Sequence, residues 1–227
     1  MSGWLIVAVL AAVAALDTYD VLQALVHQPL VIGTLTGAAL GMPLEGAWFG
    51  ALLQLPRASE LPVGTTLYPD RGPVTAGLVG GVLLALETVP GDLALTGVLV
   101  LLVALPAFGL SGRVAIAQFN WQESLDRSVR SAPTGRREAR LRSALAVGLA
   151  LTAVRGAVVG VIGAGIGQLL VRLAGRLPLA GRIQPWELLV GVAAAGLTYL
   201  VLTLGERRLL PWLLAGAALA GLGTAVL

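Results

Sequence analysis

The chain contains no cysteine, no lysine and a single histidine among its 227 residues. Without cysteine it can form no disulfide, no thiolate metal site and no cysteine nucleophile. Without lysine it cannot contain the Gly-x-x-x-x-Gly-Lys loop that holds phosphates. His27 has no second histidine at a metal-ligand spacing, and it stands two residues before Pro29. We therefore expect no catalytic residue, no metal and no cofactor, and we interpret His27 as structural.

Charge is scarce as well. Charged residues make up 12% of the chain and hydrophobic residues 57%, whereas a soluble domain has about 25% charged and about 45–50% apolar residues. So few charges cannot cover a water-facing surface, and the composition predicts an integral membrane protein rather than a soluble enzyme. The net charge of +3 is gathered near residues 122–142, between apolar runs. This placement is typical of a cytoplasmic loop under the positive-inside rule and argues against a nucleic-acid partner.

Glycine and proline are abundant, with 30 and 12 residues, and many of them lie inside apolar runs. In membranes, small residues let helices approach closely, and prolines break helices where neighbouring protein satisfies the backbone. One set of glycines repeats at four-residue intervals, and a second set follows Met42-Pro43; the members are Gly33, Gly37 and Gly41, then Gly46 and Gly50. We expect a helical hairpin, or two half-helices, around this break.

The hydrophobic pattern gives about eight segments, of which four or five reach the roughly 20 residues that a spanning helix needs. The first run is short, and we expect it either to begin a helix that continues past Asp17 and Asp20 or to form a partly embedded segment. Residues 56–73 contain four prolines and cannot form a continuous helix. Residues 143–171 are apolar, and they either cross once or fold back. The predicted fold class is all-α: a polytopic integral membrane protein with re-entrant or broken helical hairpins, forming one domain over residues 1–227.

Polar residues inside this apolar sequence are candidates for a site. A charged side chain at mid-bilayer costs about 2.5–3.5 kcal/mol on insertion scales, so Arg155 must face a polar pathway or a partner. It either contacts a substrate or pairs with a buried carboxylate such as Asp70 or Glu45. Gln54, Thr65 and Asp70 gather around the broken segment, where they either bind the hydroxyls of a neutral sugar or cap helix ends. The candidate substrate-binding residues are Gln54, Thr65, Asp70 and Arg155.

The run from His27 to Gly41, HQPLVIGTLTGAALG, resembles the opening signature of enzyme IIC, the membrane subunit of mannose/fructose/sorbose-type phosphotransferase systems. Leu53-Gln54, then Glu60 to Gly64, then Tyr68-Pro69-Asp70 follow in the order of three further elements of that family. Weaker similarities lie downstream, at Gly112-Arg113 with Asn120 and Asp126, at Thr152 to Gly156 and at Leu210 to Gly216.

The resemblance implies an all-helical, multi-pass subunit of the cell inner membrane that binds and translocates a hexose-type sugar. It also implies a hetero-oligomer with the enzyme IID membrane subunit, served by soluble IIA and IIB phosphocarrier components. Because the phosphoryl group travels on histidines of those partners, the resemblance implies that this chain is not itself an enzyme.

Two positions depart from the family pattern. Gln54 stands where the family has an acid, and Pro62 stands where it has an asparagine. An amide in place of a carboxylate loses charge-assisted hydrogen bonds, each worth about 1.5–3 kcal/mol. Three hypotheses follow: a subunit that transports hexoses or a different sugar, a divergent non-transporting scaffold or sensor that keeps the IID contact, and an unrelated small-solute permease.

Overall fold

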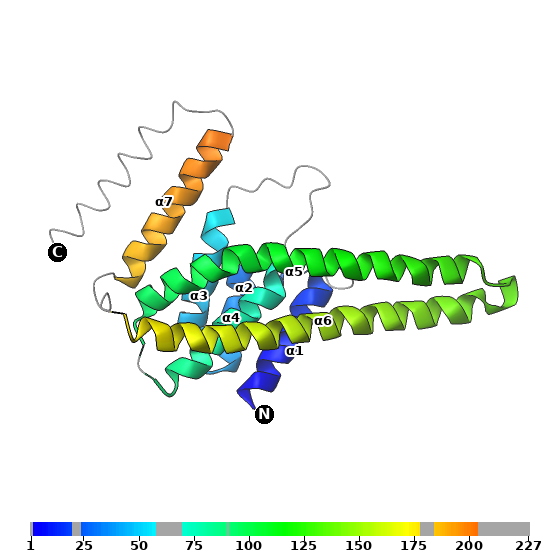
Figure 1. Cartoon of the computed structure of the whole chain (residues 1–227), viewed down its shortest axis with the longest axis horizontal. Coiled ribbons are helices and arrows are strands. Elements are labelled where there is room, and N and C mark those ends of the chain that lie inside the picture. The colour runs from blue at the N-terminus through cyan, green and yellow to red at the C-terminus, as the bar shows by residue number, and fades with distance from the viewer. Residues whose placement is uncertain (1, 20–23, 58–69, 90, 178–183, 204–227) are drawn as a thin grey trace.

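The computed structural model describes residues 2–19, 24–57, 70–89, 91–177 and 184–203, and these residues form helices joined by turns (Figure 1). The helices are α1 (Gly3–Tyr19), α2 (Pro29–Ala39), α3 (Pro43–Gln54), α4 (Arg71–Leu86), α5 (Leu93–Arg130), α6 (Arg137–Ala174) and α7 (Pro185–Thr203), with short 3-10 turns at Leu55–Arg57 and Thr134–Arg136. The predicted all-α class is confirmed over these residues, which include no strand. The similarity at residues 210–216 lies outside them.

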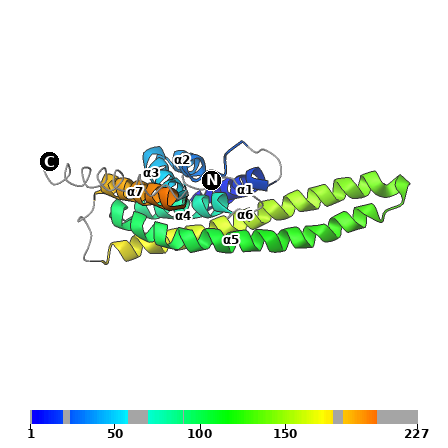
Figure 2. The same ribbon diagram turned by 90° about the horizontal axis from the view of Figure 1, so that it is seen from above.

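Helices α5 and α6 form a long antiparallel hairpin that determines the shape of the molecule. The two helices lie side by side in both views, and α1 to α4 pack against the half of the hairpin away from its turn (Figures 1 and 2). The buried apolar core joins α3 and α4 to the hairpin and includes Phe49, Leu53, Leu78, Val79, Val82, Leu83, Val100, Phe108 and Val171. The other half of the hairpin extends past this bundle as an arm.

Local sequence explains where several helices begin. Helices α2 and α3 each begin at a proline, a residue that suits the first helical turn because the backbone N–H it lacks has no partner there. Between them Gly41 has a φ of +81°, a left-handed conformation that glycine adopts without strain. Asp92 caps α5, since its carboxylate accepts a hydrogen bond from the Leu95 amide at 2.8 Å. Pro106 lies inside α5 and leaves one backbone hydrogen bond of that helix unmade.

Helices α2 and α3 pack through their glycines, as the spacing predicts. A Cβ built on Gly33 would lie 2.8 Å from the Gly46 oxygen and 2.8 Å from the Gly50 Cα. A Cβ on Gly46 would lie 2.7 Å from the Gly37 Cα. The two backbones are therefore in contact, and the predicted pair of helices interrupted at Met42-Pro43 is observed.

A second set of close contacts joins α4 to α6 and α1 to α6. A Cβ on Gly77 would lie 2.5 Å from the Gly160 oxygen, and one on Gly81 would lie 2.6 Å from the Ala164 carbonyl carbon. A Cβ on Gly156 would lie 2.6 Å from the Ala15 Cβ. These glycines carry the same four-residue spacing as the first set, although we did not predict their contacts.

The structure corrects one expectation about the hairpin and decides between two alternatives left open for it. Residues 122–142 are not an irregular loop: α5 is helical to Arg130 and α6 resumes at Arg137, so the basic segment is the tip of a helical hairpin. Residues 143–171 lie in the single helix α6, so they do not fold back. Within the described ranges, α5 and α6 are long and apolar enough to cross a membrane, and several shorter helices are apolar as well.

Candidate functional site

A buried ion pair joins α4 to α6. Asp70 precedes the first residue of α4, and Arg155 lies near the middle of α6. Arg155 Nη1 donates to Asp70 Oδ2 at 2.5 Å, and both side chains are buried. Of the two carboxylates expected as alternatives for Arg155, the partner is therefore Asp70 and not Glu45.

Helix α5 supplies a third member of this cluster. Ser111 Oγ donates to the same Asp70 oxygen at 3.1 Å, so Oδ2 accepts two hydrogen bonds. Asp70 occupies the N-cap position of α4, but its side chain makes no capping hydrogen bond. The other oxygen, Oδ1, is buried and accepts no hydrogen bond from the residues that the structure describes. A buried acceptor without a donor is costly, so a hydroxyl group that reached this oxygen would satisfy it.

Further polar side chains line the seam between α5 and α6 toward the hairpin tip. Gln118 Nε2 donates to Thr152 Oγ1 at 2.8 Å, and Gln122 Nε2 donates to the Gly148 carbonyl at 3.2 Å. Thr152 is buried and lies one helical turn from Arg155. The polar contacts thus continue from the ion pair into the arm.

A second buried carboxylate holds the segment that leads into α2. Asp17, near the end of α1, is fully buried. One of its oxygens accepts hydrogen bonds from His27 Nδ1 at 2.7 Å and from the His27 amide at 2.9 Å, and the other accepts from the Ala24 amide at 2.6 Å. These bonds agree with the structural interpretation of His27.

Gln54 lies at the end of α3, where its Nε2 donates to Oε1 of Gln28 at 2.8 Å. Gln54 Oε1 is buried and accepts no hydrogen bond within the described part of the chain. A Cβ on Gly72 would lie 3.0 Å from the His27 Cα, so the segment with His27 and Gln28 touches the start of α4. The Gln28–Gln54 pair and the Asp70–Arg155 pair therefore lie at the same end of the bundle.

The structure brings Asp70 and Arg155 together and places Gln54 against Gln28. Thr65 lies outside the described residues. Sequence reasoning did not single out Asp17, Ser111 or Gln28 as members of polar contacts. The sequence does contain a feature that could have indicated the contact of Asp17: it is an acid that ends an apolar run ten residues before the only histidine. Nothing in the sequence distinguishes Ser111 from other hydroxyl residues in apolar helices.

The chain matches a protein family described as "PTS system sorbose-specific iic component" over residues 2–225. The match therefore includes α1 to α7 and every candidate residue discussed above. A search of curated proteins finds no match.

Proposed function

This chain belongs to the sorbose-specific IIC family of the phosphotransferase system, and from that premise we propose that it binds a hexose-type sugar and translocates it across the cell inner membrane as a multi-pass subunit. Members of this family are membrane-embedded transport subunits of phosphotransferase systems, and phosphoryl transfer belongs to other components. The observation that carries the proposal is the match over residues 2–225, which leaves almost no part of the chain outside the family.

The proposed sugar site is formed by Gln54, Thr65, Asp70 and Arg155. Two of its oxygens, Asp70 Oδ1 and Gln54 Oε1, are buried acceptors that receive no hydrogen bond from the described residues. Sugar hydroxyls are donors that suit such oxygens. Arg155 would hold the Asp70 side chain in place, because its guanidinium contacts the opposite carboxylate oxygen.

The proposed assembly is a hetero-oligomer of the mannose-type system. The chain would associate with an enzyme IID subunit in the membrane, and soluble IIA and IIB components would carry the phosphoryl group to the sugar. In this arrangement the chain binds the sugar and lets it cross the membrane, and the partner components transfer the phosphoryl group.

The test measures uptake and phosphorylation of hexoses by the complex reconstituted with IID, IIA and IIB. Loss of one charge-assisted hydrogen bond lowers affinity by about tenfold or more, so Asp70→Asn should raise the sugar concentration needed for half-maximal uptake by at least that factor. Asp126→Asn is the matched control, because Asp126 is exposed on the arm. Uptake that is the same in Asp70→Asn and wild type would refute this site.

A non-transporting scaffold or sensor is the second candidate, and one observation favours it. The amide of Gln54 is already bonded to Gln28, at the position where the family has an acid. Under this hypothesis the chain binds IID but supports no uptake, and genes for IIA, IIB and IID need not lie nearby. The third hypothesis, an unrelated small-solute permease, is wrong because the chain matches the IIC family over nearly its whole length.

A further inference from the structure

The tip of the α5–α6 hairpin carries all of the chain's net charge. Residues 122–142 contain six arginines and three acidic residues, whereas the rest of the chain has nine of each. The excess of +3 is thus confined to 21 consecutive residues. These residues occupy the end of the arm that extends past the bundle (Figure 1).

Ion pairs within the tip do not neutralise its positive charge. Arg130 pairs with Asp126 at 2.7 Å and Arg142 with Glu138 at 2.6 Å, each within one helix and exposed. Within the described residues, the remaining tip arginines form no ion pair; they are Arg127, Arg136, Arg137 and Arg140. Exposed pairs of this kind contribute little, so the tip presents a positive field to its surroundings.

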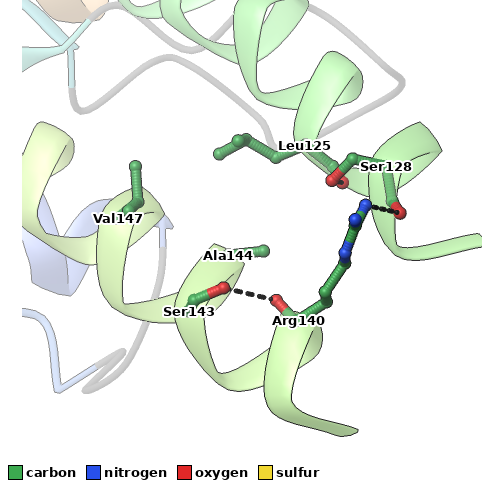
Figure 3. A pocket seen from close by; sticks show the side chains of 6 residues that line it. All are labelled: Leu125, Ser128, Arg140, Ser143, Ala144 and Val147. Atoms are coloured by element: carbon green, nitrogen blue, oxygen red, sulfur yellow. Dashed lines mark hydrogen bonds between the residues drawn. The ribbon is translucent and has the colours of Figure 1, made fainter. Parts of the chain in front are cut away.

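One of these arginines lines a groove between the two helices. A cavity of about 250 Å³ is bounded by Leu125, Ser128, Arg140, Ser143, Ala144 and Val147 (Figure 3). Arg140 reaches across it, and its Nη1 donates to the Ser128 carbonyl at 3.3 Å. The two serine hydroxyls donate within their own helices, Ser128 Oγ to the Leu125 carbonyl and Ser143 Oγ to the Arg140 carbonyl, and Leu125, Ala144 and Val147 supply an apolar surface. The groove therefore combines one cation with an apolar wall.

The surface around the groove exposes several large apolar side chains. Trp121, Leu141, Leu145 and Val147 are 51%, 47%, 58% and 42% exposed. A second cavity, of about 420 Å³, continues this apolar surface and is lined mostly by leucine, valine, alanine and glycine side chains of both helices. Tryptophan beside arginine is typical of the membrane–water interface, where the ring meets acyl chains and the charge meets headgroups.

We propose that the hairpin tip binds anionic phospholipid, with the headgroup phosphate at Arg140 in the groove and the acyl chains against the exposed apolar side chains. A guanidinium binds phosphate oxygens through paired N–H donors. A zwitterionic headgroup would bring a second cation into a region of net positive charge. A soluble acidic protein would match the arginines but would leave the apolar surface uncovered.

The test uses the full-length chain in detergent and counts bound lipid by native mass spectrometry. Phosphatidylglycerol and phosphatidylcholine with the same acyl chains are the two probes. Because one arginine near an anionic surface is worth about a fivefold change in binding, Arg140→Gln should lower retention of phosphatidylglycerol by about that factor. Arg172→Gln removes the same charge from an exposed position at the opposite end of α6 and should leave retention unchanged.

A double variant, Arg136→Gln with Arg137→Gln, keeps the test independent of the Arg140 hydrogen bond. Both residues are exposed, so helical content by circular dichroism should match wild type while retention of phosphatidylglycerol falls. Equal retention of the two lipids by wild type would overturn the proposal, as would equal losses in Arg140→Gln and Arg172→Gln. Binding of a soluble IIA or IIB component that requires Arg140 and proceeds without lipid would also overturn it.

Discussion

Gln54 Nε2 donates a hydrogen bond to Gln28 Oε1 at 2.8 Å, and this bond links the two ends of the α2–α3 hairpin that lie away from its turn. At the other end of the hairpin Gly41 makes the turn. The glycine contacts between the two helices lie between these points. The Gln54 side chain therefore holds the open end of this hairpin together.

Gln54→Glu tests this position directly. Gln28 can turn its amide so that Nε2 donates to the new carboxylate, so the hairpin should stay closed. If the sugar site is as proposed, a carboxylate acceptor should strengthen sugar binding about fivefold, because hydrogen bonds to charged groups exceed neutral ones by roughly 1 kcal/mol. Sugar titration of the reconstituted complex measures this change. Gln54→Ala is the control that removes the acceptor and should weaken sugar binding. Equal affinity in Gln54→Glu and Gln54→Ala would contradict the prediction.

Arg155→Gln should destabilise the protein severely. Removing one partner of a buried ion pair costs about 3–5 kcal/mol, because the other charge is left buried and unpaired. The matched control is Arg130→Gln, whose exposed pair with Asp126 is worth at most about 0.5 kcal/mol. Denaturant unfolding in detergent measures both. The double variant Asp70→Asn with Arg155→Gln should recover part of the loss, and no recovery would mean that the pair is not the cause.

Gly81→Ala should separate α4 from α6. The added methyl group would lie 2.6 Å from the Ala164 carbonyl carbon, and overpacking of this kind costs about 1–3 kcal/mol. Gly165→Ala is the control in the partner helix, because nothing lies within 4 Å of a Cβ there. The free energy of unfolding of that variant should rise by up to about 1 kcal/mol, because alanine has a higher helix propensity than glycine. Thermal unfolding distinguishes the two, and similar transition temperatures would contradict the observed packing.

Asp17→Ala should release the segment that precedes α2. Three donors lose their acceptor, and a hydrogen bond to a charged group is worth about 1.5–3 kcal/mol. Hydrogen exchange at the Ala24 and His27 amides should therefore become faster, while exchange in α4 should change little. Thr18→Ala is a matched control, because Thr18 Oγ1 donates only to the Ala14 carbonyl of its own helix. Unchanged exchange at both amides would mean that Asp17 does not hold this segment.

The sequence carried enough information to predict the α2–α3 break, since proline and spaced glycines act locally. For Arg155 it left two alternatives, contact with a substrate or a pair with a buried acid. It could not decide between Asp70 and Glu45, because the Arg155–Asp70 contact joins positions 85 residues apart and depends on how α4 packs against α6. That packing depends on glycines such as Gly77 and Gly160. The sequence shows that glycines recur every four residues, but it does not show which glycine contacts which.

The high charge density of residues 122–142 predicts a loop, whereas the tip of the arm is helical. The pairs Asp126–Arg130 and Glu138–Arg142 have the four-residue spacing that supports an exposed helix, and the structure shows both pairs formed. Ser111 had no such signal. Its role becomes visible only when α5 is placed beside Asp70.

Pro106 makes the two helices of the hairpin unequal in how readily they bend. It leaves α5 without one backbone hydrogen bond five residues before Ser111, and helices bend most readily at such points. Helix α6 contains no proline between Arg137 and Ala174. A bend of α5 at Pro106 would carry Ser111 away from Asp70 while Arg155 stays in place. The carboxylate would then exchange an internal hydroxyl donor for an external one without losing its counter-ion.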